Sequence, residues 1–201
     1  MMLHINKLAK LTLEFDNELL SFSHFKNYPN YLPYIGKDYS NSKKKILIIA
    51  ESHFYPDEDF YKNIDINDFY NKKVDFKDLN FMFTRFELTR IEKHRIHQIL
   101  EKFVNYEEIA YYNFFLRPAS NKKSLIVKAI DKEYSNNAFK VITNALCPDK
   151  IIFVSKKSFD ALSIENKKTY KEKIFYCVHP NSFWWHKTMK KYGNKKGKEI
   201  F

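Results

Sequence analysis

Glycine and cysteine are scarce in this chain of 201 residues. The three glycines, Gly36, Gly193 and Gly197, form neither a GxGxxG nor a P-loop pattern, so the sequence has no glycine loop that would cradle phosphates. The two cysteines, Cys147 and Cys177, form no CxxC pair and cannot build a structural zinc site alone. Because both lie in apolar contexts, we expect buried, reduced thiols, and we expect no metal and no cofactor.

Long apolar runs are also missing. No stretch approaches the ~20 apolar residues that cross a bilayer. Residues 1–22 contain acids and lack the continuous apolar segment of a signal peptide. We therefore expect no membrane contact and a cytoplasmic location. The chain is instead 44% hydrophobic and 17% aromatic, which is enough to fill the core of one domain spanning residues 1–201.

Negative charge is outnumbered by positive charge. The sequence has 35 Lys and Arg against 24 Asp and Glu, which gives a formal net charge of +11. Such an excess favours a polyanionic partner, because each phosphate contact releases counterions. The alternative is a coding bias toward lysine, since Lys far outnumbers Arg, and the charge alone does not decide between the two.

Short apolar runs alternate with amphipathic segments along the chain. The runs are rich in β-branched and aromatic residues, as strands buried on both faces of a parallel sheet are. They cover residues 45–50, 109–115, 150–154 and 173–178. Helical periodicity marks residues 4–26, 86–104, 122–146 and 156–163. The alternation predicts an α/β fold with three layers, α/β/α, around a mostly parallel four-stranded sheet.

Three further segments lie outside these core elements. Residues 1–44 are expected to form an N-terminal helix and loop, and residues 55–85 an irregular insertion of the kind found at active sites. Residues 191–201 are expected to form a flexible basic tail. His94 and His97, spaced i, i+3 on a predicted helix, are expected at the surface rather than on a metal.

Polar and aromatic side chains follow each predicted strand. Because open parallel sheets bind ligands beyond the carboxyl ends of their strands, these segments should converge on one edge. They are Glu51–Pro56, Asn113–Pro118, Ser155–Lys157 and His179–Ser182.

The four segments, in this order, resemble the motifs of the uracil-DNA glycosylase superfamily. AESHFYP at 50–56 resembles the first motif, and YYNFFLRP at 111–118 resembles the strand that ends in an asparagine. PDKIIFVSKKSFDAL at 148–162 is similar to the third strand-helix unit, and HPNSFWWHK at 179–187 to the loop that carries a DNA-penetrating wedge. The resemblance covers roughly residues 45–190. It implies a uracil-DNA glycosylase-like fold and an enzyme that flips a base from DNA and hydrolyses its N-glycosidic bond, leaving an abasic site.

The resemblance and the residue chemistry together suggest three catalytic side chains. Glu51 or His53 would activate a water or stabilise an oxocarbenium-like sugar. His179 would stabilise the negative charge that develops on the departing base. The simpler alternatives are a salt-bridge carboxylate for Glu51 and a strand-end cap for His179.

The same segments contain side chains suited to holding a base. The amide of Asn113 could recognise a base edge. Phe54, Tyr55 and Phe114 are candidates for stacking on a flipped base, with core packing as the alternative for each of them.

The loop after the last strand suggests a DNA-binding surface. Phe183, Trp184 and Trp185 lie where the family inserts a residue into the helix, and an apolar wedge there would offset lost stacking. The alternative is that the tryptophans pack the last helix onto the sheet. Phosphates would be contacted by polar and basic side chains, namely Ser182, Lys187, Lys156 and Arg117. The expected partner is DNA, duplex or single-stranded, and the expected state is a monomer.

The chain departs from the family pattern at four positions. Ala50 and Ser155 replace glycines, Ser52 stands where a water-activating aspartate is usual, and His53 replaces a proline. A serine cannot act as a strong general base, so the sequence favours a modified or damaged base over plain uracil. Two alternatives to a glycosylase remain open: a catalytically silent nucleic-acid-binding module of the same fold, and a hydrolase unrelated to DNA.

Overall fold

The computed structural model describes residues 11–55, 64–72, 74, 84–89, 94–120, 125–190 and 193–201. Within these ranges the side chains of Tyr55, Phe86, Thr89, Ser120 and Ile200 are not described. The beginning of the predicted helix over residues 4–26 and most of the predicted insertion over residues 55–85 therefore lie outside the described residues.

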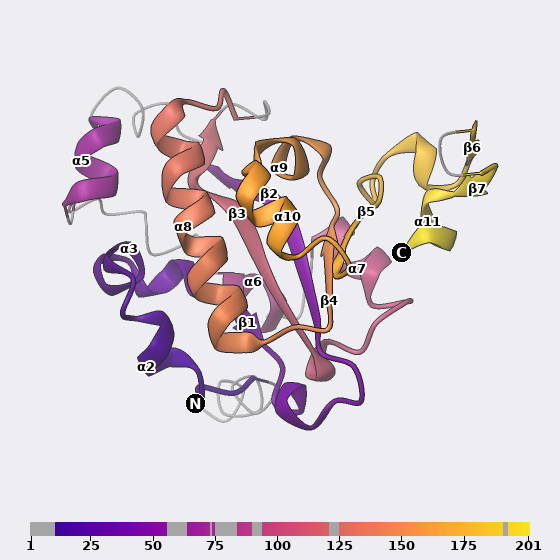
Figure 1. The fold of residues 1–201 in the computed structure, drawn as a ribbon, viewed down its shortest axis with the longest axis horizontal. Coiled ribbons are helices and arrows are strands. Elements are labelled where there is room, and N and C mark those ends of the chain that lie inside the picture. The colour runs from indigo at the N-terminus through magenta and orange to yellow at the C-terminus, as the bar shows by residue number, and fades with distance from the viewer. Residues whose placement is uncertain are drawn as a thin grey trace.

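A five-stranded, mostly parallel sheet forms the centre of the molecule (Figure 1). The strand order is β1-β3-β2-β4-β5, and only β1 runs antiparallel to its neighbour. The four predicted strands are present, and the fifth, β1, was not predicted. The strands are β1 (Tyr34–Ile35), β2 (Ile46–Tyr55), β3 (Ile109–Ser120), β4 (Lys150–Phe153) and β5 (Ile174–Tyr176).

Helices surround the sheet, and several differ in length from the sequence prediction. The α-helices are α2 (Asp16–Leu19), α3 (Ser23–Asn27), α5 (Ile66–Asn71), α6 (Thr84–Thr89), α7 (Arg95–Leu100), α8 (Ala129–Leu146), α9 (Lys156–Ala161), α10 (Ile164–Thr169) and α11 (Gly197–Ile200). The 3-10 helices are η1 (Pro29–Tyr31), η2 (Tyr39–Asn41), η4 (Tyr106–Glu108) and η5 (Phe183–Trp185). The described part of the predicted opening helix contains the two short helices α2 and α3, and α6 and α7 take the place of the predicted helix over residues 86–104.

Two hydrophobic cores lie on opposite faces of the sheet. Alternate residues of β2 point to each face: Leu47 and Ile49 belong to one core, and Ile48 and Ala50 to the other. The first core is covered by α8, which Figure 1 shows in front of the sheet with α9 and α10. The second core includes residues of α6 and α7. The sequence prediction of an α/β domain with layered helices is thus confirmed at this level.

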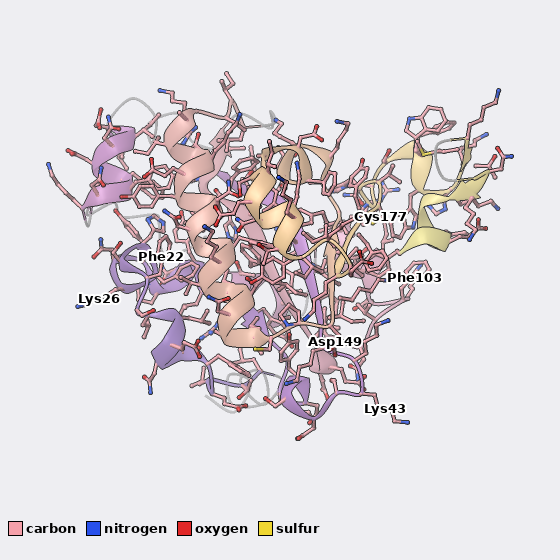
Figure 2. The ribbon with its side chains drawn as sticks, in the orientation of Figure 1. Phe22, Lys26, Lys43, Phe103, Asp149 and Cys177 are labelled. Carbon is pink, nitrogen blue, oxygen red and sulfur yellow. The ribbon has the colours of Figure 1, made fainter. Side chains whose placement is uncertain are left out.

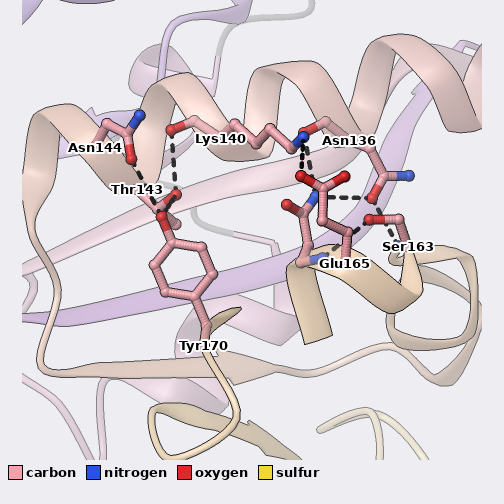
Figure 3. Close-up of polar contacts among 8 residues, drawn as sticks. Asn136, Lys140, Thr143, Asn144, Ser163, Glu165 and Tyr170 are labelled. Atoms are coloured by element: carbon pink, nitrogen blue, oxygen red, sulfur yellow. Dashed lines mark hydrogen bonds and ion pairs between the residues drawn. The ribbon is translucent and has the colours of Figure 1, made fainter. Parts of the chain in front are cut away.

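Polar contacts fasten α10 to α8 on the first face (Figure 3). The Lys140 ammonium lies 2.9 Å from the Glu165 carboxylate. The Tyr170 hydroxyl lies 2.9 Å from Thr143 Oγ1 and 3.2 Å from Asn144 Oδ1. These contacts hold α10 and the residue that follows it against α8.

The C-terminal residues are folded, so the prediction of a flexible tail is wrong for the described residues 193–201. β6 (Thr188–Met189) pairs antiparallel with β7 (Lys195–Lys196), and α11 follows directly. The aromatic rings of Trp185, Phe103 and Phe201 pack together, with Trp185 centred 5.7 Å from each of the other two. Phe103 and Cys177 both lie on the side of the molecule that carries this segment (Figure 2).

The prediction of two buried thiols is half right. Cys177 is buried in the second core, whereas Cys147 is exposed and ends α8 in a left-handed conformation with φ 44°. None of the helices within the described residues is both long and apolar enough to span a bilayer.

Candidate functional site

A cavity of about 330 Å³ opens where β2 and β3 meet the loop after β5. β2 extends to Tyr55, five residues beyond the predicted strand, so Glu51 and His53 lie within the strand rather than after it. Their register against β3 shifts between Ser52 and Phe54, and such irregularities redirect side chains. The cavity wall contains five of the predicted site residues, namely Glu51, His53, Phe54, Asn113 and His179.

His53 is buried, and its ring is held on both nitrogens. Nε2 lies 3.1 Å from Thr84 Oγ1 and 3.2 Å from Asn113 Nδ2. Nδ1 lies 3.6 Å from Glu87 Oε1. A carboxylate can only accept, and the Asn113 amide nitrogen can only donate. Nδ1 therefore directs a proton at Glu87, and Nε2 lies where it can accept from the Asn113 amide.

The order Thr84–His53–Glu87 resembles that of a nucleophile, a base and an orienting acid. Thr84 is only 1% exposed, however, and it does not line the cavity. A substrate in the cavity has no access to its hydroxyl. The arrangement therefore holds the His53 ring in place, and the described residues of this cluster provide no hydroxyl nucleophile for an acyl-transfer hydrolase.

Glu87 was missed by sequence analysis, because it lies on a helix rather than at a strand end. Burial alone would raise the pKa of Glu87, but the neighbouring imidazoles of His53, His97 and His94 outweigh it and lower the pKa. His94 is exposed as predicted, whereas His97 is buried and its Nδ1 lies 3.1 Å from the Tyr106 hydroxyl. The prediction that His97 lies at the surface is therefore wrong.

Glu51 is oriented by two side chains of the loop and helix after β4. Ser155 Oγ donates to Glu51 Oε2 at 3.1 Å, and Lys157 Nζ lies 3.3 Å from Oε1. The Glu51 side chain remains 26% exposed. A carboxylate held in this way presents a fixed negative charge to the cavity.

His179 follows β5 and faces the same space. Its Nδ1 accepts a hydrogen bond of 3.1 Å from the Asn181 backbone N–H, which leaves the ring proton of the neutral imidazole on Nε2. Burial lowers the pKa of His179, and the charge of Glu51 only partly offsets this effect. The ring is therefore a neutral donor at physiological pH.

A second cavity of about 430 Å³ adjoins the first, since Glu51 and His179 line both. Lys156 and Lys157 lie on one side of it, and Ser182 and Trp184 lie on the other. Lys156 is exposed and pairs with Asp160 one helical turn away. The two cavities together make a groove that has basic and aromatic walls.

Two of the three predicted wedge aromatics are exposed. Phe183 is 66% and Trp184 is 49% exposed, and their rings lie 5.5 Å apart. The Lys187 ammonium lies 5.0 Å from the Phe183 ring centroid. Ser182 caps η5 by accepting from the Trp184 backbone N–H at 3.3 Å. Trp185 is fully buried, which excludes it from any DNA contact in this conformation.

Two other predictions are wrong because the side chains are buried elsewhere. Phe114 is fully buried in the first core and cannot stack on a base. Arg117 is 3% exposed, and its guanidinium donates twice to Asp131, at 2.8 and 2.6 Å, so it is not available to a phosphate. Phe54 is 42% exposed and lines the cavity as a stacking residue would, whereas the Tyr55 side chain lies outside the described residues.

Within the described ranges, no three His, Cys, Asp or Glu side chains are grouped so as to hold a metal ion. Comparison of the chain with protein-family models, with curated proteins and with solved structures gives no match.

Proposed function

We propose that this protein is a DNA glycosylase that accepts a flipped, modified or damaged base in the 330 Å³ cavity and hydrolyses its N-glycosidic bond. The single observation that carries the proposal is the meeting of Glu51 of β2, Asn113 of β3 and His179 of the loop after β5 in one cavity wall. A carboxylate, an amide and a neutral imidazole are the groups needed to stabilise a sugar cation, hold a base and receive leaving-group charge.

His179 is suited to stabilising the departing base. Cleavage of an N-glycosidic bond leaves negative charge on the base, and a preplaced donor lowers the barrier where that charge develops. The Asn181 N–H fixes the proton of His179 on Nε2, and burial keeps the ring neutral. The neutral imidazole therefore presents its Nε2–H as the donor to the departing base.

Glu51 is suited to the sugar side of the reaction. Lys157 and Ser155 hold its carboxylate at the junction of the two cavities. From there it would stabilise an oxocarbenium-like transition state and orient the attacking water. His53 is buried and bonded to Thr84 and Asn113, so we assign it the role of positioning Asn113 rather than that of the base that activates water.

The groove beside the cavity is suited to an opened nucleic-acid strand. Trp184 lines the second cavity, and the exposed Phe183 ring lies 5.5 Å from the Trp184 ring. An apolar insertion there would offset the stacking lost on base flipping. Lys156 and Lys187 supply positive charge for the flanking phosphates.

The activity is tested with duplexes that each carry one modified or damaged base, incubated with protein and then cleaved with alkali at abasic sites. We expect strand scission for at least one base, and we expect His179→Ala and Glu51→Gln each to reduce the rate by about a hundredfold or more.

Matched variants control for charge and for loop disturbance. His186→Ala removes an exposed imidazole from the same loop, and Glu165→Gln removes an exposed carboxylate on α10, and neither residue lines the cavity. Both controls should keep the wild-type rate. Salt-sensitive duplex binding without scission across the panel would contradict the proposal and support the catalytically silent module, and scission that survives in His179→Ala would rule out the assigned mechanism.

A further inference from the structure

A carboxylate that the strand-end motifs do not include lies in the wall of the cavity. Glu87 belongs to α6 and lines the cavity beside Asn113 and His53. Its side chain is 19% exposed, and its Oε1 lies 3.6 Å from His53 Nδ1 and 3.9 Å from His94 Nε2. Glu51, the other acid of the wall, differs because Lys157 and Ser155 contact it.

Glu87 is ionised at neutral pH. The imidazoles around it lower its pKa despite its burial. An ionised carboxylate has lone pairs and no proton, so it can only accept hydrogen bonds. A ligand group that contacts Glu87 must therefore bring its own hydrogen.

Asn113 adds a second acceptor to the same wall. Its amide nitrogen lies 3.2 Å from His53 Nε2 and donates one of its two N–H groups there, which turns the nitrogen toward the imidazole. An amide engaged through its nitrogen has its carbonyl oxygen left to accept from a ligand. Donors are also present in the lining of the cavity, namely Arg95 and His94, and His94 lies beside Glu87.

Nucleobases differ in whether the exocyclic group that such a wall would contact donates or accepts a hydrogen bond. Cytosine and adenine carry an exocyclic amine, which donates, whereas uracil, thymine and hypoxanthine carry a carbonyl oxygen at the corresponding ring position, which accepts. An amine satisfies an acceptor wall. When a carbonyl oxygen is placed against Glu87, the carbonyl and the carboxylate are both acceptors, and no proton lies between them. A site built to accept a hydrogen bond from its ligand strongly rejects a ligand that cannot donate one.

We propose that the cavity selects nucleobases that bear an exocyclic amine, with the Glu87 carboxylate as the residue that determines this specificity and the Asn113 carbonyl oxygen beside it. The inference rests on the proposed function for the identity of the ligand as a nucleobase. It goes beyond that function by naming the class of base, namely substituted cytosines and adenines. The corresponding bases with a carbonyl oxygen, namely substituted uracils and hypoxanthine, are excluded.

The test uses pairs of duplexes that differ only in amine against carbonyl. One pair carries 5-hydroxymethylcytosine or 5-hydroxymethyluracil, and the other carries adenine or hypoxanthine. Each base is placed opposite a tetrahydrofuran abasic analogue, so that its pairing strength in the duplex does not contribute. Binding is measured by fluorescence anisotropy, and base release is measured under single-turnover conditions.

We expect the amino member of each pair to bind or react at least about tenfold better in the wild-type protein. Glu87→Gln, whose amide can donate as well as accept, should reduce this preference to within about threefold. Glu165→Gln should leave it intact. Equal treatment of the two members, or preference for the carbonyl member, overturns the inference, and because that comparison uses the wild-type protein it does not depend on how well a variant folds.

The two proposals fail in different ways. If the protein binds amine-bearing bases more tightly but releases no base, the proposed glycosylase activity is wrong and the proposed amine selectivity is supported. Release of carbonyl-bearing bases with no preference for amines would leave the glycosylase standing and remove the selectivity.

Discussion

Buried polar side chains in this protein fall into two kinds. Arg117 and Asp131 satisfy one another, and Asp131 also accepts from the Tyr70 hydroxyl at 2.7 Å and from the Lys128 backbone N–H. His24 is fully buried with neither ring nitrogen hydrogen-bonded, among the rings of Tyr28 and other aromatic residues. A buried polar group without a partner costs free energy, so His24 is a weak point of the fold under conditions that protonate it.

Acid should destabilise the protein through His24. Burial lowers the pKa of His24 to about 3 from an ordinary value of 6.5. Because the unfolded chain takes up the proton first, the stability that neutral His24 permits is complete above pH 6.5 and is lost progressively as pH falls toward 3. We expect the free energy of unfolding in urea to fall by about 2 kcal/mol between pH 7 and pH 5.

His24→Phe should flatten this pH dependence, because phenylalanine keeps the aromatic packing and takes up no proton. His179, whose pKa is also lowered by burial, contributes in the same direction, so a small slope should remain. An unchanged slope in His24→Phe would show that another group controls the acid response.

Sequence analysis identified cavity-lining residues within and after the strands, and it missed the one that comes from a helix. Glu51, Asn113 and His179 could be identified because each interrupts or follows an apolar run, and parallel strands bring such positions to one edge. Glu87 could not be identified from sequence, because its approach to His53 depends on how α6 packs across the sheet. Such packing leaves no local pattern in the sequence. Arg117 and Phe114 were misassigned because burial depends on which face of β3 each side chain occupies.

Among the secondary-structure elements, the loop after β5 and the C-terminal segment act as one unit. η5 places Phe183 and Trp184 outward and Trp185 inward, and Trp185 packs against α11 through Phe201. A methyl group at Gly197 would collide with the Val178 side chain, which shows how closely α11 approaches the end of β5. The exposed pair Phe183 and Trp184 is therefore held by a folded segment rather than by a flexible arm.

Adjacent tryptophans of this unit should have opposite roles. Trp185→Ala should destabilise the protein by about 3–5 kcal/mol, because it removes a large, fully buried side chain. Trp184→Ala should change the free energy of unfolding by less than about 0.5 kcal/mol and should weaken duplex binding. Chemical denaturation and fluorescence anisotropy on the two variants measure both effects. If neither variant binds DNA more weakly than the wild-type protein, the proposal that these aromatics act as a wedge is wrong.

The elements that sequence analysis predicted best are those with strong local patterns. The runs in β2 and β4 are apolar on both faces and could be recognised without tertiary information. β1 is only two residues long, so its existence depends on pairing with β3 and leaves no periodic signal. The predicted helix over residues 86–104 overlaps two described helices, α6 and α7, and its central residues 90–93 lie outside the described residues.

For the whole molecule, the proposed DNA binding should weaken steeply with salt, because basic side chains that contact phosphates release counterions. Lys187 lies beside the exposed Phe183 ring, whereas Lys26 lies on the opposite side of the molecule (Figure 2). Lys187→Ala should weaken duplex binding and reduce the slope of log affinity against log salt by about 1.

Lys26→Ala is the matched control, since it removes the same charge from an exposed site far from the groove. It should leave both the affinity and the slope close to the wild-type values. Equal effects of the two substitutions would mean that the positive charge acts diffusely and that the groove has no special part in binding.

The most direct measurement quantifies free base and abasic sites in the same reaction, by mass spectrometry and by an aldehyde-reactive probe, on DNA that contains amino-bearing modified bases. The account predicts one released base for each new abasic site, with both products absent in His179→Ala. Tight DNA binding with neither product from wild-type protein, across the whole set of bases, would contradict it.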